Sequence, residues 1–370
     1  MVKRRHLVIA VSLATGLVGQ AAAQVGGSAT MTPTNDLPNP YQTITGWAKL
    51  PEGRTWGSTS AVDIDKDGVS IWVAERCQQN SCTGSDLPAI LKFDANGNLV
   101  KSFGAGILNF PHGIHVDRDG NIWVTDGRDN RVGRGRGAAA DAPLPPQPAV
   151  IYGHQIFKFS PDGQLLMTLG TKGGGRDSLF FWQPNDVLVT PNGDIFVAEG
   201  HASNATANAR ILKFDRTGKL IKTFGSYGYG ASQFRGPHSL AMDSKGRLFV
   251  ADRGNRRIQI FDQDGKHLDT WYQFSRISGI HIDANDTLYA IDSESDDNYN
   301  PGWRKGLRVG SARTGEVWYF VPEHVSKQAS GMGGYGSMGE GVTVDGQGIV
   351  YAGEVGPIQG LTKFVPRLKR

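Results

Sequence analysis

The feature that most constrains this chain is a short segment that recurs six times. Each copy has an apolar strand, a polar turn, usually with Asp and Gly, and a second strand that ends in an acidic residue. The copies are SAVDIDKDGVSIWVAE, HGIHVDRDGNIWVTD, NDVLVTPNGDIFVAE, HSLAMDSKGRLFVAD, SGIHIDANDTLYAID and EGVTVDGQGIVYAGE. Most are followed by a second hairpin, such as ILKFDANGNLVKSFG at residues 90–104. Two hairpins make the four antiparallel strands of a propeller blade, so six copies predict an all-β, six-bladed β-propeller.

The two ends of the mature chain are expected to meet. The sixth copy is followed by one further strand, LTKFVPR, and by no clear fourth strand. Residues 43–51, TITGWAKLP, form a strand that has no blade of its own. We expect this strand to join the last blade and close the ring, because closure removes exposed sheet edges. The propeller would then be a single domain over residues 24–370.

Residues 1–23 are typical of a signal peptide. MVKRR is positively charged, LVIAVSLATGLVG is apolar, and QAAAQ offers a cleavage site after Ala23. The apolar run is too short to span a membrane comfortably, so we expect an exported protein, periplasmic or secreted, without a stable membrane anchor. Three of the positive charges lie in this segment, so its removal lowers the formal charge from +4 to +1. The remaining charge gives no reason to expect a nucleic-acid surface.

The chain has two cysteines, Cys77 and Cys82, in the segment ERCQQNSC. An exported protein folds in an oxidising compartment. We therefore predict a disulfide that closes a small loop.

One position of the repeat is expected to line the central channel near one mouth. In the six copies it is occupied by Ser60, His112, Asn185, His238, Ser278 and Glu340. Alternate blades of six lie about 120° apart, so His112, His238 and Glu340 should converge. Two imidazoles and a carboxylate are a common catalytic zinc shell, although nickel, iron or manganese would also fit. We predict a divalent metal here, with zinc as the first candidate, and we expect His115 and His281 to face away from the axis.

A second ring of residues follows the second strands. It contains Arg76, Arg128, His201 and Arg253. Guanidinium groups around a metal would bind a carboxylate or another oxyanion through paired donors. His201 is then the natural general base or acid.

The segments FPHGIHVD, GPHSLAMD and VADRGNRRIQIF resemble peptidyl-α-hydroxyglycine α-amidating lyase, and the repeat style resembles NHL-repeat propellers. The similarity to the lyase runs from about residue 57 to the end. It implies a six-bladed propeller that splits a hydroxyglycine-extended peptide into an amide and glyoxylate. It also implies that His112 and His238 are two of three zinc histidines, with Glu340 at the third position.

The resemblance assigns further roles. Arg76 and Arg253 match the substrate-binding arginines of the family, and Met338 matches its active-site methionine. His201 replaces the catalytic tyrosine. The family's calcium would use the backbone carbonyls of Val62 and Ile114, but its aspartate is replaced by Gly341, so this site departs from the pattern.

Three insertions, residues 127–154, 293–306 and 322–341, are expected to enclose the face that carries these residues. The leading hypothesis is a monomeric, metal-dependent carbon-nitrogen lyase that acts on a peptide or a small molecule. It would cleave an N–Cα(OH) carbinolamide to an amide and glyoxylate or a related carbonyl product. One alternative is a non-catalytic propeller that binds a protein, peptide or polysaccharide. Another is a metal-dependent hydrolase or lactonase.

Overall fold

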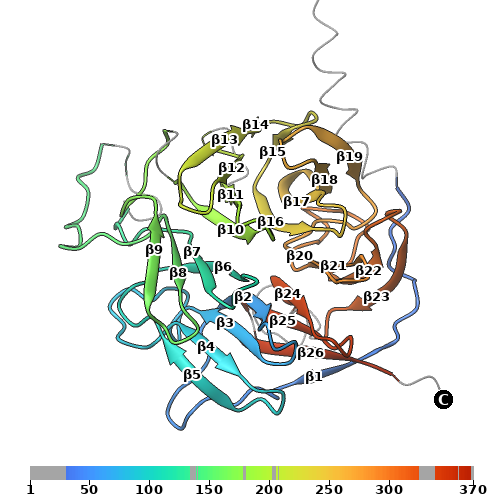
Figure 1. Cartoon of the computed structure of the whole chain (residues 1–370), viewed down its shortest axis with the longest axis horizontal. Helices are drawn as coiled ribbons and strands as arrows, with labels where there is room; N and C mark the ends of the chain where they lie inside the picture. Colours follow the sequence, from blue (N-terminus) through green and yellow to red (C-terminus); the bar gives the residue numbers. More distant parts are fainter. Residues whose placement is uncertain are drawn as a thin grey trace, which may run out of the picture.

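The computed structural model describes residues 31–133, 139, 141–177, 181–201, 206, 208–324, 338–356 and 358–367. These residues form β-strands and one turn of 3-10 helix, η1 (Arg253–Asn255), and the described ranges contain no α-helix. Six four-stranded sheets surround a central axis (Figure 1). The predicted all-β, six-bladed propeller is confirmed. The predicted signal peptide lies outside the described residues.

The first three blades are each built from four consecutive strands. Blade 1 contains β2 (Thr59–Ile64), β3 (Ile71–Glu75), β4 (Ile90–Phe93) and β5 (Leu99–Phe103). Blade 2 contains β6 (Pro111–Val116), β7 (Ile122–Asp126), β8 (Gln155–Phe159) and β9 (Leu165–Leu169). Blade 3 contains β10 (Pro184–Val189), β11 (Ile195–Glu199), β12 (Arg210–Phe214) and β13 (Leu220–Phe224).

Blades 4 and 5 repeat this order. Blade 4 contains β16 (Pro237–Met242), β17 (Leu248–Asp252), β18 (Arg257–Phe261) and β19 (His267–Trp271). Blade 5 contains β20 (Gly279–Ile282), β21 (Thr287–Asp292), β22 (Gly306–Ser311) and β23 (Val317–Pro322). A small parallel pair, β14 (Ser226–Tyr227) and β15 (Gln233–Phe234), lies between blades 3 and 4 in sequence.

Blade 6 joins the two ends of the chain. Its inner strands are β24 (Gly341–Val344), β25 (Val350–Glu354) and β26 (Gly360–Pro366), and its outer strand is β1 (Tyr41–Thr45). β1 pairs antiparallel with β26 from Tyr41 and Pro366 to Thr45 and Thr362. The predicted closure is confirmed. The strand ends earlier than residue 51 because the chain turns at Gly46, which has φ 65°, and reaches blade 1 at Lys49.

The turns of the repeat are held by their acidic residues. In blade 2, a carboxylate oxygen of Asp117 accepts hydrogen bonds from the backbone of Asp119 and Asn121. Its other oxygen accepts the indole N–H of Trp123 at 3.0 Å. Gly120, at φ 86°, supplies the left-handed conformation that the turn needs. These bonds fix the pairing of β6 with β7.

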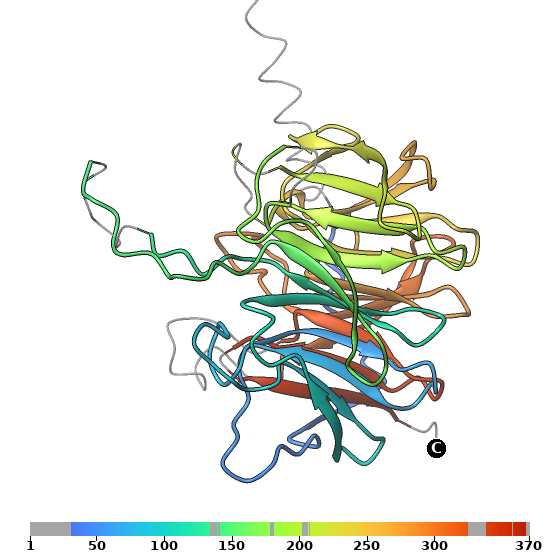
Figure 2. The same cartoon turned by 60° about the vertical axis from the view of Figure 1, so that its left-hand side comes forward.

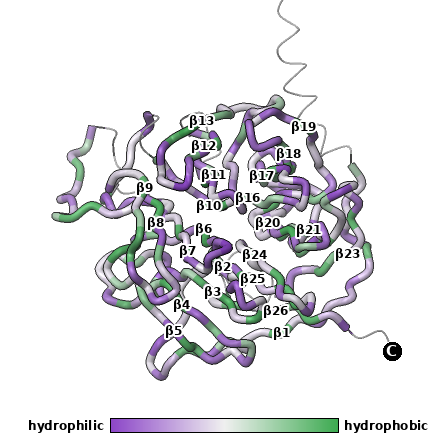
Figure 3. The backbone as a smooth tube through the Cα atoms, in the orientation of Figure 1, coloured by the Kyte–Doolittle hydropathy of each residue, from purple (hydrophilic) through white to green (hydrophobic). Residues whose placement is uncertain are grey.

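The hydrophobic core is divided into six clusters, one at each interface between neighbouring blades. The cluster between blades 1 and 2, for example, contains Trp72 and Phe159, which are both almost fully buried. Hydrophobic and hydrophilic segments are therefore interspersed around the ring rather than gathered in one place (Figure 3). Since each sheet buries its faces only against its neighbours, the fold depends on a closed ring.

The first strands of blades 1 to 4 contain β-bulges near their beginnings. In β6, three residue steps from Pro111 to Ile114 lie opposite two steps from Asp126 to Val124. The extra residue reverses the alternation of side chains beyond it. As a result, residues three positions apart can both face the channel.

Two of the three insertions are described in whole or in large part. The described part of residues 127–154 projects away from the blades, so it does not cover the ring as expected (Figure 2). Residues 293–306 are described, whereas residues 325–337 of the third insertion lie outside the described ranges. In the described part, no helix is long and apolar enough to cross a membrane.

We expect removal of β1 to open the ring. A chain that starts at residue 47 lacks the five pairs of β1 with β26. At about 0.5–1.5 kcal/mol for each hydrogen bond, it should lose about 4 kcal/mol of unfolding free energy. Urea denaturation against a chain that starts at residue 41, which keeps β1, measures this loss. Equal stability of the two chains would show that β1 does not close the ring.

Candidate functional site

A cavity of about 700 Å³ follows the propeller axis and is lined by the first strands of the blades. Near one end its lining includes His112 on β6, His238 on β16 and Glu340 just before β24. All three are largely buried, with at most 9% of their surface exposed. The expected convergence of these side chains is observed.

Backbone carbonyls of the intervening blades orient the two histidines. His112 Nδ1 lies 2.9 Å from the carbonyl oxygen of Asn185, and His238 Nδ1 lies 2.7 Å from that of Ser278. A carbonyl can only accept a hydrogen bond, so each Nδ1 must carry the proton. Both Nε2 atoms are buried and have no hydrogen-bond partner in the part of the chain that the structure describes. Each Nε2 therefore presents its lone pair to the channel, as in histidines that bind metals.

Glu340 lies directly against one of these lone pairs. Its Oε1 is 3.3 Å from His238 Nε2. Burial and the nearby Arg253 lower the pKa of His238, and His112 has its pKa lowered well below the usual value, mainly by burial. Burial acts to raise the pKa of Glu340, but that pKa is held well below its ordinary value, and the positive charge of Arg253 is one of the causes. At neutral pH the cluster therefore has neutral imidazoles facing a carboxylate.

His201 joins this group. One potential ligand atom from each of His112, His201, His238 and Glu340 lies within 4.8 Å of all the others. The ring of His201 is 5.1 Å from that of His112 and 5.3 Å from that of His238, measured between centroids. His201 follows β11 directly, which agrees with its predicted place at the exit of a second strand. The sequence did not predict that it would reach the metal-binding cluster.

Arg253 is already paired with carboxylates. Its NH1 lies 3.2 Å from Glu340 Oε1 and 3.2 Å from Glu294 Oε1. Its NH2 lies 3.4 Å from His201 Nε2. Arg276 donates to the second carboxylate oxygen of Glu294 at 2.6 Å. Arg253 thus holds Glu340 in place and is less free to bind a substrate carboxylate than the sequence suggested.

Arg76 is also buried, but unlike Arg253 it donates its hydrogen bonds to uncharged acceptors. It donates to the carbonyl of Pro111, to Asn80 Oδ1 and to Ser60 Oγ, and its guanidinium lies 3.6 Å from the ring centre of Phe110. Only 3% of its surface is exposed, and burial lowers its pKa to about 10. Within the described ranges no carboxylate forms an ion pair with it. Glu340 attracts this guanidinium from a distance, but no described carboxylate contacts it, so the buried cation is a favourable place for an anion.

The loop after Arg76 is closed by the predicted disulfide. Cys77 and Cys82 are bonded, which confirms the prediction. Asn80 lies inside this loop and holds Arg76, while its carbonyl accepts a long hydrogen bond of 3.4 Å from Arg128. Arg128 also lies 4.1 Å from the ring centre of Phe110, so both predicted arginines of this side contact one aromatic ring. The disulfide loop therefore positions Arg76.

The other predicted residues are less directly placed. Met338 is 2% exposed and packs in the apolar cluster between blades 5 and 6. Val62 and Ile114 lie in the channel wall. A Cβ atom at Gly341 would approach the carbonyl of Ser60 to 2.2 Å, so the backbone leaves no room for an aspartate there. A role for Met338 in substrate binding and the calcium site both remain predictions.

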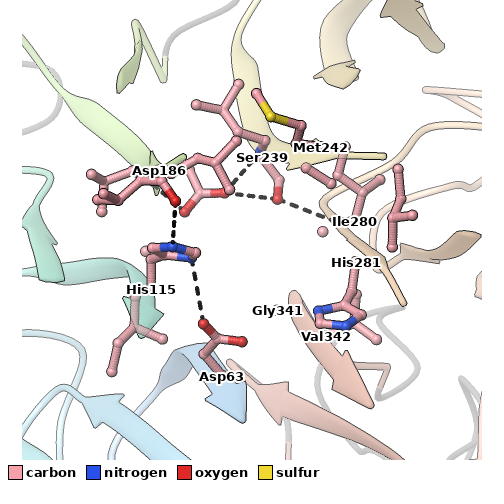
Figure 4. A pocket seen from close by; sticks show the side chains of 18 of the residues that line it. Asp63, His115, Asp186, Ser239, Met242, Ile280, His281, Gly341 and Val342 are labelled. Carbon is pink, nitrogen blue, oxygen red and sulfur yellow. Dashed lines mark hydrogen bonds and ion pairs between the residues drawn. The ribbon is translucent and has the colours of Figure 1, made fainter. Parts of the chain in front are cut away.

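A second polar zone lies further along the channel (Figure 4). It includes Asp63, His115, Asp186, Ser239 and His281, all of which line the cavity. The expectation that His115 and His281 face away from the axis was therefore wrong. For His115 the reason is the bulge in β6, which the repeat pattern does not reveal.

Sequence analysis missed Glu294, Asn80 and Phe110. Glu294 lies two residues after the end of β21, the same offset that Arg128 and His201 have after β7 and β11. Extending that register to the fifth copy would have found it. Asn80 and Phe110 occupy loop positions that carry no repeat signal.

Comparison with known proteins agrees with the repeat analysis. Residues 108–134 and 234–261 match the NHL repeat. The chain carries NHL repeats. These two segments contain His112 and His238, so the matched repeats are the ones that supply the histidines of the cluster.

Two curated relatives illustrate what this chain resembles. Human NHL repeat-containing protein 3 is 32% identical over 238 residues, which cover 62% of this chain and 59% of the relative. A probable peptidyl-alpha-hydroxyglycine alpha-amidating lyase of Caenorhabditis elegans is 34% identical over 223 residues, covering 55% of each protein. The chain thus spans less than two thirds of the length of these relatives. It resembles the amidating lyases, as its Pro-His segments predicted.

Two solved structures share the fold. A streptogramin B lyase superposes with a TM-score of 0.52 at 14% identity and covers 88% of this chain and 97% of its own. A gluconolactonase from Xanthomonas campestris also gives 0.52 at 14% identity and covers 89% of this chain and 95% of its own. At this identity the likeness concerns the propeller fold alone.

Asp186 in the channel should make stability depend on pH. Burial raises the pKa of its carboxyl from 3.8 to about 7. Between these values the unfolded chain has lost the proton that the folded chain keeps, so unfolding free energy falls as pH rises and then becomes constant above about 7. Asp186→Asn should lack this component.

Urea unfolding of both proteins at pH 4.5, 5.5, 6.5 and 7.5 measures the difference. Relative to Asp186→Asn, the wild type should lose stability steadily as pH rises through this range. A difference that stays constant, or that changes in the opposite direction, would show that Asp186 is ionised throughout.

Proposed function

We propose that this protein is an exported, divalent-metal-dependent lyase that cleaves the N–Cα bond of an α-hydroxyglycine-type carbinolamide. The products would be an amide and glyoxylate, or a related carbonyl compound. The proposal joins the resemblance to amidating lyases with the contents of the channel. The substrate would be a peptide or small molecule that ends in a carbinolamide and a carboxylate.

One contact carries the metal part of the proposal. His238 Nε2, with its lone pair outward, lies 3.3 Å from the carboxylate oxygen Glu340 Oε1. Two buried acceptors at this distance repel one another unless a proton or another cation lies near both. The lowered pKa of His238 disfavours the proton, so a metal ion is the better cation. Imidazole and carboxylate donors suit zinc first, and also iron, nickel or manganese.

Arg76 is proposed to hold the carboxylate of the substrate. Its three donors now reach neutral oxygens, and Phe110 shields one face of the guanidinium. A substrate carboxylate would supply the missing counter-charge through a charge-assisted hydrogen bond. Arg253 would act mainly on Glu340, which it contacts at 3.2 Å. Arg128, beside Phe110, is placed to assist at the rim.

The proposed cleavage consumes no water. The hydroxyl group on Cα loses its proton as the C–N bond breaks, and the electrons of the O–H bond form the new C=O bond. The electron pair of the C–N bond stays on nitrogen, which takes up a proton to give the amide. A bound divalent ion would supply polarisation of the hydroxyl oxygen. This chain's residues orient the carboxylate and keep the cluster largely away from water.

The proposal predicts both metal content and a specific product. Purified protein from which residues 1–23 have been removed should contain about one divalent ion per chain. With α-hydroxyhippurate it should release glyoxylate and benzamide in equal amounts. Removal of the metal with a chelator should abolish release, and zinc or cobalt should restore it. Glu340→Gln, which keeps the shape but removes the charge, should weaken metal binding and activity together.

Other results would favour the alternatives. Bound metal, no glyoxylate and hydrolysis of a lactone would identify the hydrolase or lactonase instead. Absence of both metal and turnover would leave a propeller that binds a protein, peptide or polysaccharide.

The role of Arg76 can be tested by substitution. Arg76→Ala should lower kcat/KM for α-hydroxyhippurate on the order of 10- to 100-fold, the effect of losing a charged hydrogen bond of about 1.5–3 kcal/mol. Arg76→Lys should recover only part of it, because lysine lacks the paired donors. Arg118→Ala is a suitable control, since that side chain is 71% exposed. Unchanged kinetics of Arg76→Ala would remove Arg76 from the substrate site.

A further inference from the structure

We infer that His201 is the fourth protein ligand of the metal site, in place of the acid–base role that its sequence position suggested. This inference depends on the proposed function in one respect, which is that the site binds a metal. The first observation is its place, since a ligand atom of His201 lies within 4.8 Å of those of His112, His238 and Glu340. One potential ligand atom from each of three imidazole rings and one carboxylate thus lies in the same small region.

The surroundings of His201 Nε2 determine which of its two ring nitrogens carries the proton in the neutral imidazole. Arg253 NH2 lies 3.4 Å from this atom. Arginine can only donate hydrogen bonds, so an N–H at His201 Nε2 would face another N–H. The stable neutral form therefore has its proton on Nδ1 and a lone pair on Nε2. This is the same form that the carbonyls of Asn185 and Ser278 impose on the other two histidines.

The contact with Arg253 is too long to occupy that lone pair fully. N–H hydrogen bonds are usually 2.7–3.2 Å long, so 3.4 Å indicates a weak interaction. His112 Nε2 and His238 Nε2 accept or donate no hydrogen bond among the described residues, although Glu340 Oε1 lies 3.3 Å from His238 Nε2. The cluster therefore offers three imidazole nitrogens and a carboxylate oxygen that are ready to bind a cation.

An acid–base role for His201 is unfavourable in the same place. Accepting a proton would put a second positive charge beside Arg253 and close to His112 and His238. Arg253 NH2 is only 3.4 Å from His201 Nε2, and the rings of His112 and His238 lie 5.1 and 5.3 Å from that of His201. A neutral imidazole is the form that binds metals.

A four-residue shell changes how a substrate can enter. Three protein ligands leave a tetrahedral metal with one open position, whereas four leave none. The substrate must therefore expand the shell or displace one ligand. Among the three histidines His201 is the one with intermediate exposure, and it follows β11 instead of lying on a first strand.

Cobalt binding tests this inference without using activity. Apo protein would be titrated with Co(II) in competition with a chelating indicator, and the visible absorption of bound Co(II) recorded. His201→Ala and His201→Gln should bind Co(II) at least about 10-fold more weakly than the wild type, and their spectra should change. Added imidazole should restore the spectrum of His201→Ala. His267→Gln, on the outer strand β19, is the matched histidine control.

Two results would overturn the inference, and they differ from a failure of the proposed function. In the first, both His201 variants bind Co(II) with the affinity and spectrum of the wild type, but they lose glyoxylate release and one limb of its pH profile. That result would identify His201 as a base. The second is a changed spectrum of His201→Ala that imidazole does not restore although circular dichroism shows an unaltered fold, which would place the effect of His201 outside direct coordination. If the wild-type protein binds no Co(II), the metal-dependent function itself fails.

Discussion

The hydrogen bonds from His112 and His238 to the carbonyls of Asn185 and Ser278 determine what the channel can do. Each bond joins an even-numbered blade to the next odd-numbered one, so the chemistry of the cluster depends on the packing of neighbouring sheets. Because the carbonyls can only accept, they fix both protons on Nδ1 and turn both lone pairs inward. The fold thereby leaves two buried imidazole nitrogens that face the channel close to the Glu340 carboxylate.

The charges around this place are arranged asymmetrically. On one side Arg253 is neutralised by Glu340 and Glu294, and Arg276 adds a further bond to Glu294. On the other side Arg76 has only neutral partners. The first arrangement stabilises the cluster itself. In the second arrangement the buried guanidinium of Arg76 can attract an anion from outside the chain.

Much of this could be predicted from the sequence, because blade repeats and channel positions follow from strand periodicity. The six blades, the closing strand and the convergence of His112, His238 and Glu340 all have that origin. Side chains beyond the bulges, such as His115, could not be placed, since one extra residue reverses the alternation without leaving a clear mark. The pairing of Arg253 and the reach of His201 depend on loop conformations that periodicity does not determine.

The partnership of β1 with β26 also bears on the order of folding. Tyr41 must pair with Pro366, so nearly the whole chain has to be made before the last blade can be completed. Contacts between such distant residues form slowly, because the intervening chain must first be brought together. Until then the apolar faces between blades 6 and 1 stay open. An unfinished ring therefore exposes apolar surface that the finished ring buries.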